Sequence, residues 1–276
     1  MEALERLQAK ALFNVEGCTA VVTGGAAGIG LAYAEAMAAN GANVTLIDAD
    51  GAALDRAVAA LVHRGLPATG VAADVTDNAA VHAAIADAVR RTGRLDAVFA
   101  NAGITAGPGF LAAAGGARDP AGAIENIPDG LWQKVLDTNL TSVLTTIGAC
   151  VPHMKAAGGG SIIVTTSIAG LRPSAVVGTP YMIAKAGAAH LVRQAALELA
   201  RYGIRVNAIA PGPFATRITS PELTAIWSRA LPVGRIASTD EIKGLALYLA
   251  SQASGFVTGA QFVIDGGSLL GRADLT

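Results

Sequence analysis

The sequence has little cysteine, little charge of either sign and no long uninterrupted apolar run. Its two cysteines, Cys18 and Cys150, are far apart in apolar surroundings, so we expect neither a disulfide framework nor a cysteine metal site. The four histidines are scattered, and no metal is predicted. A net charge of −1 gives no electrostatic footprint for nucleic acid or an anionic membrane. Charges or glycine clusters interrupt every apolar stretch before it reaches transmembrane length.

The N-terminal segment, MEALERLQAKALFNVEG, is amphipathic and charged. It lacks the apolar core of a signal peptide and is too acidic for a transit peptide, so a cytoplasmic protein is expected. We interpret residues 1–16 as an extension that precedes the first strand. Packing of this extension on its own chain and packing on a neighbouring subunit are equally compatible with the sequence.

Short runs rich in valine, isoleucine and alanine alternate with long alanine-rich runs of helical periodicity. This alternation predicts an α/β fold, a doubly wound parallel sheet flanked by helices, with strands buried on both faces. No break in composition splits the chain, so residues 17–276 are predicted to form a single Rossmann-fold domain with seven strands. The expected strands are 19–24, 43–48, 68–74, 95–103, 161–167, 205–212 and 261–267, and the expected helices are 30–41, 51–65, 77–93, 129–155, 181–203 and 239–251.

Two segments are longer than the usual connections of an α/β domain. They are a glycine- and alanine-rich insert at residues 104–130 and a loop at residues 212–235. Both follow the carboxyl ends of predicted strands, where α/β sheets bind ligands, and long loops in compact domains are usually functional or disordered. The insert is therefore interpreted as a lid on the substrate, a subunit contact or a mobile surface loop, and the 212–235 loop as a substrate loop.

The first expected strand leads directly into TGGAAGIG, residues 23–30, and then into a helix. Gly24, Gly28 and Gly30 allow a tight turn and close approach to a phosphate, which the N–H groups of the helix start can bind. The next strand ends in Asp48, whose carboxylate can accept hydrogen bonds from ribose hydroxyls and would repel a 2′-phosphate. No arginine or lysine stands in the glycine loop or just after Asp48, so the sequence favours NAD over NADP.

Tyr181 and Lys185 are four residues apart in a largely apolar helical run, so their side chains share one helix face. An isolated pair of this kind usually packs a tyrosine ring on a lysine stem. Here the pair is one of seven short motifs in order along the chain. The others are TGGAAGIG, Asp74–Val75, NAG at residues 101–103, Asn139 in DTNL, Ser167 in TTSIAG, and PGPFAT at residues 211–216.

With these motifs the chain resembles the short-chain dehydrogenase/reductase family, in its short, single-domain branch, over residues 17–267. The resemblance implies reversible hydride transfer between a carbinol carbon and the nicotinamide, with Tyr181 as general acid/base. A free tyrosine has a pKa of about 10, and lowering it by about three units takes roughly 4 kcal/mol of phenolate stabilisation. We expect the Lys185 ammonium to supply much of this, helped by the positive nicotinamide ring. The resemblance also implies that Lys185 holds the nicotinamide ribose, that Ser167 binds the substrate oxygen and that Asn139 holds a water in the proton relay.

The same resemblance assigns residues to the cofactor. Asp74 is expected to receive the adenine amino group beside the Val75 backbone, and Thr216 to bind the carboxamide. Asn101 either contacts the cofactor or braces the central sheet, and the sequence weighs these roles equally. The complete predicted set is Gly24, Ala27, Gly28, Ile29, Gly30, Asp48, Asp74, Val75, Asn101, Ala102, Gly103, Tyr181, Lys185, Pro211, Gly212, Phe214 and Thr216.

A substrate pocket is predicted between the insert, residues 168–180 and residues 213–230. Its expected lining is mostly apolar, which favours an uncharged, partly hydrophobic secondary alcohol or ketone. By resemblance, helices at 131–157 and 181–202 form a shared contact in a homotetramer or homodimer. The candidate lining residues are Phe110, Leu171, Val176, Val177, Phe214, Ile218 and Trp227.

These features predict an NAD-dependent oxidoreductase acting on a secondary alcohol or its ketone, without a nucleic-acid or membrane partner. One alternative is a 3-oxoacyl thioester reductase; such enzymes usually favour NADP, against which Asp48 argues. A second alternative is a nucleotide-binding scaffold without chemistry. The complete set of Asn139, Ser167, Tyr181 and Lys185 argues against that reading.

Overall fold

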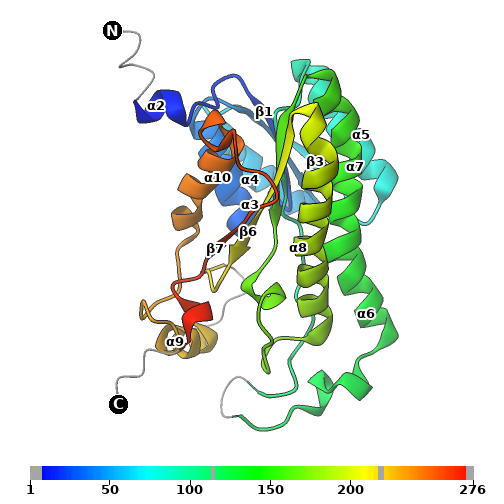
Figure 1. Ribbon diagram of the computed structural model, residues 1–276, viewed down its shortest axis with the longest axis vertical. Coiled ribbons are helices and arrows are strands. Elements are labelled where there is room, and N and C mark those ends of the chain that lie inside the picture. The colour runs from blue at the N-terminus through cyan, green and yellow to red at the C-terminus, as the bar shows by residue number, and fades with distance from the viewer. Residues whose placement is uncertain (1–7, 113–115, 217–220, 272–276) are drawn as a thin grey trace.

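The computed structural model describes residues 8–112, 116–216 and 221–271. Seven parallel strands form one sheet in the order β3-β2-β1-β4-β5-β6-β7, which confirms the predicted doubly wound Rossmann fold (Figure 1). The chain starts at β1 in the sheet interior, winds outward to β3, returns to β4 and continues to β7. The strands are β1 (Thr19–Thr23), β2 (Asn43–Asp48), β3 (Ala68–Ala72), β4 (Ala97–Ala100), β5 (Gly160–Thr165), β6 (Ile204–Pro211) and β7 (Gln261–Ile264).

Helices cover both faces of the sheet and bury two separate apolar cores. On one face lie α5 (Asn78–Thr92), α7 (Ser142–Ala156) and α8 (Thr179–Leu199), and on the other α3 (Gly28–Ala39), α4 (Gly51–His63) and α10 (Lys243–Ala250) (Figure 1). Alternate residues of one strand enter opposite cores, as strand geometry requires. Among the described residues, no helix is long and apolar enough to cross a membrane. The remaining helices are α2 (Ala9–Leu12), α6 (Asp129–Leu136) and α9 (Pro221–Ala230).

The third strand differs from the sequence prediction. All strands were expected to be buried on both faces, but Thr69, Gly70 and Ala72 of β3 are exposed. β3 lies at the edge of the sheet and pairs only with β2, so fewer elements cover it than cover the central strands. An apolar composition therefore did not distinguish this edge strand from a central one.

The long helix predicted at residues 129–155 is interrupted. It consists of α6, a π-helical segment at Asp137–Thr141, and α7, which follow one another without a turn. A π-helical turn holds one more residue than an α-helical turn and is often found at functional sites. Asn139, one of the predicted catalytic residues, lies in this segment and is completely buried.

Part of the described N-terminal extension packs on its own chain. Val15 is only 1% exposed and belongs to the core under α3 and α10. The ring of Phe13 lies 6.3 Å from that of Tyr248, centroid to centroid. Phe13 and Val15 thus contact their own chain, whereas residues 8–12 are exposed, and the packing of that part stays open between the two arrangements.

Candidate active site

The predicted catalytic and cofactor residues gather at the carboxyl ends of the strands β1 to β6 and at the start of α8. β1 and β4 are neighbours in the sheet, but the chain continues from β1 to β2 on one side and from β4 to β5 on the other. The ends of β1 and β4 therefore form a topological switch point, where open α/β sheets bind ligands. The loops after these two strands touch each other. A Cβ placed on Gly24 would lie 2.9 Å from the Cα of Ala102.

Ser167, Tyr181 and Lys185 come together at the end of β5. Ser167 follows this strand by two residues and caps a short 3-10 turn, its Oγ accepting a hydrogen bond from the Ala169 N–H at 3.1 Å. Tyr181 and Lys185 lie in the first two turns of α8. The Ser167 side chain lies beside the Tyr181 hydroxyl and acts to lower the pKa of that phenol. The structure thus brings together the serine and the tyrosine that the motifs singled out.

Lys185 is one of the most deeply buried charged groups in the described chain. Its side chain is 3% exposed, and burial lowers the pKa of its amine to about 8. Among the described residues, its one hydrogen-bond acceptor is the carbonyl oxygen of Thr165, 2.8 Å from Nζ. An ammonium can donate three hydrogen bonds, so this group keeps capacity for further acceptors beside Tyr181.

The pKa of Tyr181 differs from the expectation. The Lys185 ammonium was expected to lower it, but burial raises the pKa of Tyr181, and the neighbouring Ser167 side chain opposes this only in part. The Nζ atom lies 5.6 Å from the centroid of the Tyr181 ring and donates to Thr165 rather than to the phenol. Desolvation of the phenol therefore outweighs the ammonium in the protein by itself.

Asn139 uses its side-chain amide to fix the start of the 104–130 insert. Its Nδ2 donates to the carbonyl oxygens of Ile104 and Val135, both at 3.0 Å, and its Oδ1 accepts from the Ile104 N–H at 3.1 Å. A Cβ on Gly103 would lie 2.5 Å from the same Oδ1. The amide is thus occupied by backbone, and only its location, not its contacts, supports the water-holding role that the resemblance implied.

Asn101 braces the sheet, the second of its two predicted roles. Its Nδ2 donates to the carbonyl oxygens of Thr23 and Gly24 at 3.1 and 3.2 Å. Its Oδ1 accepts from the Thr165 hydroxyl at 3.0 Å. One amide therefore joins the ends of β1, β4 and β5, and it ties the glycine loop to the strand that carries Ser167.

Sequence reasoning missed three residues of this network: Thr23, Tyr33 and Thr165. The Thr23 hydroxyl accepts from the N–H groups of Asn101 and Ala102 at 3.0 and 3.2 Å. The Thr165 hydroxyl is oriented to donate to two acceptors, Asn101 Oδ1 at 3.0 Å and the Tyr33 hydroxyl oxygen at 3.4 Å. The one available signal was a pair of strand-end threonines directly before Ser167.

The acidic residues assigned to the cofactor lie beside the loops they were predicted to serve. Asp48 ends β2, and its two oxygens accept from the N–H groups of Ala26 and Asp50, each at 3.0 Å. Asp74 is exposed, and hydrogen bonds from the backbone and hydroxyl of Thr76 lower the pKa of its carboxyl. Both carboxylates are thus fixed by backbone at the rim of the site. Val75 beside Asp74 is buried, and Ala27 and Ile29 lie at the N-terminus of α3.

The segment after β6 reaches back to the glycine loop. A Cβ on Gly28 would lie 3.4 Å from Cγ2 of Thr216, so these predicted cofactor residues are neighbours. Pro211 ends β6, and Gly212 lies against the backbone of Asp265. Phe214 is 5% exposed and belongs to the core under α3 and α10, and its place on the pocket wall stays a prediction.

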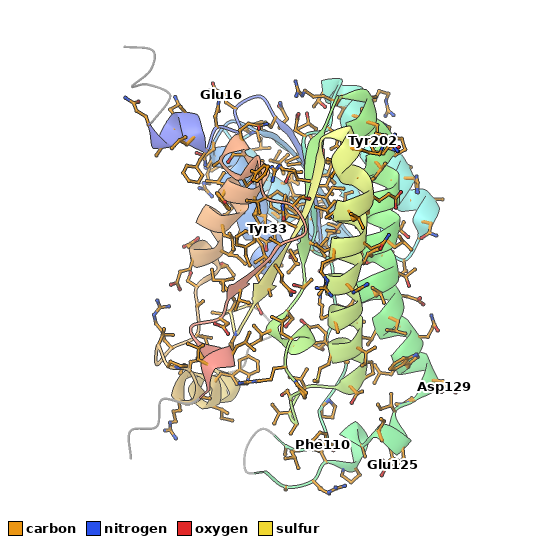
Figure 2. All side chains as sticks on the ribbon, viewed as in Figure 1. Glu16, Tyr33, Phe110, Glu125, Asp129 and Tyr202 are labelled. Carbon is orange, nitrogen blue, oxygen red and sulfur yellow. The ribbon has the colours of Figure 1, made fainter. Side chains whose placement is uncertain are left out.

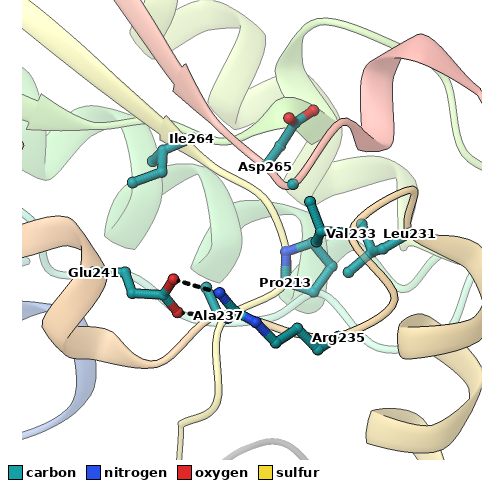
Figure 3. Close-up of a pocket in the computed structure, with 9 residues that line it drawn as sticks. Pro213, Leu231, Val233, Arg235, Ala237, Glu241, Ile264 and Asp265 are labelled. Carbon is teal, nitrogen blue, oxygen red and sulfur yellow. Dashed lines mark hydrogen bonds and ion pairs between the residues drawn. The ribbon is translucent and has the colours of Figure 1, made fainter.

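The other predicted pocket residues are spread over the surface at this end of the sheet. Phe110, Leu171 and Val176 are exposed, whereas Val177 and Trp227 are half-buried. Ile218 lies outside the described residues. A cavity of about 210 Å³ lies under the 212–235 loop, but none of these residues lines it, and its Arg235 and Glu241 are paired with each other (Figure 3). Its lining is Pro213, Leu231, Val233, Arg235, Ala237, Glu241, Ile264, Asp265 and Gly266.

Comparison with known proteins agrees with this fold and site. A family model described as enoyl-(acyl carrier protein) reductase matches residues 24–268. The chain is 38% identical over 252 residues to the cis-4-hydroxycyclohexanecarboxylate dehydrogenase of Sinomonas cyclohexanicum, covering 90% of this chain and 95% of that one.

Two solved structures extend the comparison. A short-chain type dehydrogenase/reductase from Mycobacterium marinum superposes with a TM-score of 0.84 at 33% identity, covering 93% of this chain and 97% of that one. A 7α-hydroxysteroid dehydrogenase in complex with NADH and 7-oxo glycochenodeoxycholic acid has a TM-score of 0.84 at 28% identity, covering 98% and 100%. Two of these proteins have names that state a reaction. One is a dehydrogenase of a hydroxycyclohexanecarboxylate and the other is a dehydrogenase of a hydroxysteroid, so both are oxidoreductases. The match to residues 24–268 and these likenesses over most of its length show that the chain belongs to the short-chain dehydrogenase/reductase family, whose members bind a nicotinamide cofactor, NAD or NADP.

Proposed function

We propose that this protein is an NAD-dependent oxidoreductase that interconverts a secondary alcohol and its ketone, with Tyr181 as the proton acceptor and donor. One observation carries the proposal. At the end of β5, the Ser167 side chain lies beside the Tyr181 hydroxyl, and Lys185 is buried one turn further along the same helix face. This arrangement combines a proton-transfer group, a hydroxyl that can hold the substrate oxygen and a buried cation.

The chain's own residues fit a nicotinamide dinucleotide. A Cβ on Gly30 would overlap the carbonyl oxygen of Gly24, so the loop closes on α3 only with glycine there. Ala27, the N-cap of α3, makes no side-chain capping bond, which leaves N–H groups at the helix start for a phosphate. Lys185 has donors to spare for ribose hydroxyls. When bound, the nicotinamide supplies the hydride acceptor or donor.

Asp48 supports NAD rather than NADP. Two backbone N–H groups fix its carboxylate beside Ala26 of the glycine loop, so the negative charge has a defined position where the adenosine ribose is expected. A 2′-phosphate at that position would meet like charge. A ribose hydroxyl would meet an acceptor that retains free lone pairs.

The protonation states of the two helix residues define their roles. With a pKa raised by burial, Tyr181 is a neutral phenol at neutral pH and donates its proton to a ketone oxygen in the reductive direction. Alcohol oxidation requires the phenolate as base and is therefore expected to accelerate as pH rises. Lys185, with a pKa of about 8, is about 90% protonated at pH 7. Ser167 holds the substrate oxygen against Tyr181 and stabilises the charge that develops on it.

The substrate that we propose is a ring-bearing secondary alcohol or its ketone. The exposed apolar side chains of Phe110, Leu171 and Val176 near the start of α8 support an uncharged, partly hydrophobic reacting portion. The named substrates of two relatives, a hydroxycyclohexanecarboxylate and a bile-acid ketone, carry their reacting oxygen on an alicyclic ring.

We also propose a cytoplasmic homotetramer. Leu144 on α7 and Ile183 and Leu197 on α8 are large apolar residues exposed on two adjacent helices (Figure 1). Association through these helices would cover them. If the protein does not associate, light scattering would show the mass of one chain, and the proposal would be wrong.

The test is NADH formation from NAD with a panel of cyclic, aryl, sugar-derived, steroid and hydroxyacyl alcohols, run in parallel with NADP. We expect turnover of cyclic secondary alcohols with NAD, and its loss in Tyr181→Phe, which keeps the ring and removes the proton. Activity that survives this substitution would refute the role of Tyr181. Turnover of hydroxyacyl thioesters with NADP alone would favour the alternative 3-oxoacyl thioester reductase.

A further inference from the structure

The 104–130 insert folds back on itself as a short two-armed ribbon. Leu111 and Arg118 form an antiparallel bridge. The Ala112 N–H donates to the Ala117 carbonyl oxygen at 2.9 Å, and the Asp119 N–H donates to that of Phe110 at 3.0 Å. The described parts of the insert therefore have a regular backbone arrangement.

The first arm of this ribbon also pairs with the segment that connects Ser167 to Tyr181. Pro108 forms an antiparallel bridge with Val177, and the Leu111 N–H donates to the Ala175 carbonyl oxygen at 2.9 Å. The connecting segment thus continues the ribbon as a third extended arm. We call residues 106–111, 118–122 and 175–178 together the clasp.

Direct backbone contacts hold the clasp together. A Cβ on Gly122 would overlap the carbonyl oxygen of Gly109, and a Cβ on Gly109 would overlap that of Ala175. A Cβ on Gly178 would lie 2.5 Å from the carbonyl oxygen of Ala106. The atoms that a Cβ would meet here are backbone atoms, which cannot move aside as the end of a flexible side chain can. The arms therefore fit together only with glycine at these positions.

The clasp is attached to catalytic residues at both of its ends. At one end Asn139 holds Ile104 through two hydrogen bonds. At the other, Gly178 is the N-cap of α8, and its carbonyl oxygen accepts from the Tyr181 N–H at 3.2 Å. Phe110 lies just beyond the N-terminal end of α8 (Figure 2).

We propose that the clasp is a fixed wall of the substrate site that sets substrate specificity. In this arrangement Gly122 and Gly109 are positioning residues that hold the 175–178 arm, and Phe110 is the residue that meets the apolar part of the substrate. The substrate class in this inference rests on the proposed function, whereas the existence of the clasp does not. It assigns the insert a role distinct from a moving lid, because the glycine contacts exist in only one relative position of the arms.

The first test is Gly122→Ala, followed by amide hydrogen exchange, which needs no activity. We expect faster exchange in two separate stretches together, residues 105–112 and 171–178, because the displaced second arm releases the first arm and its partner. Gly130→Ala is the matched control. Nothing lies within 4 Å of a Cβ at Gly130, the last residue of the insert and the second of α6, so this substitution should leave exchange in both stretches unchanged. Faster exchange in the insert alone would overturn the clasp.

The second test covers the case in which Gly122→Ala does not fold. Phe110→Ala changes an exposed side chain and leaves the backbone contacts in place. We expect its kcat/KM for ring-bearing alcohols to fall about tenfold, and that for propan-2-ol and the dissociation constant of NADH to stay within about twofold. Ile124→Ala, which truncates a 77% exposed residue of the same insert, is the control and should change none of these values.

An equal loss for propan-2-ol and ring-bearing alcohols in Phe110→Ala would overturn the assignment of specificity to this wall, as would no loss at all. If no alcohol reacts with the unmodified protein, the proposed function fails instead. The exchange experiment, with the folded control beside it, then still decides whether the clasp exists.

Discussion

Replacement of Lys185 by methionine is expected to stabilise the protein at neutral pH while it removes the activity. The amine is 3% exposed, and burial lowers its pKa from 10.5 to about 8. At about 1.36 kcal/mol per pKa unit, keeping this amine charged in the folded protein costs about 3 kcal/mol. Methionine has a similar length and no charge, so the variant avoids this cost.

The same substitution has an opposing effect. It removes the donor to the Thr165 carbonyl oxygen, and an unsatisfied buried acceptor costs about 1–3 kcal/mol. The net expectation at pH 7 is a gain of about 1 kcal/mol, or a rise in Tm of roughly 2–4 °C.

The difference in unfolding free energy between the Lys185→Met variant and the unmodified protein is expected to change sign as pH rises. Between about pH 8 and pH 10.4, unfolded Lys185 still binds its proton while the folded protein has released it, so stability of the unmodified protein rises with pH. Above about pH 10.4 both states are neutral, and the cost of the buried charge disappears. The methionine variant should then be less stable by about 2 kcal/mol, because only the lost hydrogen bond remains.

Urea unfolding of both proteins at equal concentration, from pH 7 to pH 10.5, measures this difference. Lys134→Met serves as the control, because Lys134 is exposed on α6 and its substitution should give a difference that does not vary with pH. A difference between Lys185→Met and the unmodified protein that stays constant over this range would refute the reasoning, since the ammonium would then not be desolvated.

Three further substitutions test other parts of the site and core. Asp48→Ala removes the charge beside Ala26, and we expect the ratio of NADPH to NADH affinity, measured by calorimetry, to rise at least about tenfold. Tyr33→Phe keeps the stacked ring but removes the hydroxyl that accepts from Thr165, so urea unfolding should show a loss of about 1 kcal/mol. Arg205→Met removes the half-buried guanidinium that donates to two carbonyls at the end of α10. The free energy of unfolding should fall by about 2–4 kcal/mol in the same assay, and a fall below about 0.5 kcal/mol would contradict the bracing role of Arg205.

Periodicity and motif order were sufficient to predict the sheet and most of the site. The strands that precede Gly24, Asn101 and Ser167 are where the apolar runs predicted them, because an apolar run must be buried between the two layers of helices. The i,i+4 spacing of Tyr181 and Lys185 likewise predicted that the two side chains share one helix face.

What the sequence did not predict depends on contacts between distant segments. Phe214 was expected in the pocket because it follows a strand end, but it packs into a core that also contains residues of α3 and α10. The pKa of Tyr181 depends on how much protein covers the phenol, which spacing alone does not give. The π-helical segment around Asn139 and the pairing of the insert with residues 175–177 also leave no local signature that periodicity can detect.

The strand order has a consequence for synthesis on the ribosome. β1 to β4, with the glycine loop, Asp48 and Asn101, form one continuous stretch of chain, so this half can assemble first. At about 5–20 residues per second, Lys185 emerges roughly 4–17 s after Asn101. Until β5 follows, the free side of β4 presents unpaired backbone groups on the apolar stretch Ala97–Ala100, which the finished protein buries completely. The interval between these two halves is when the nascent chain is most exposed to aggregation.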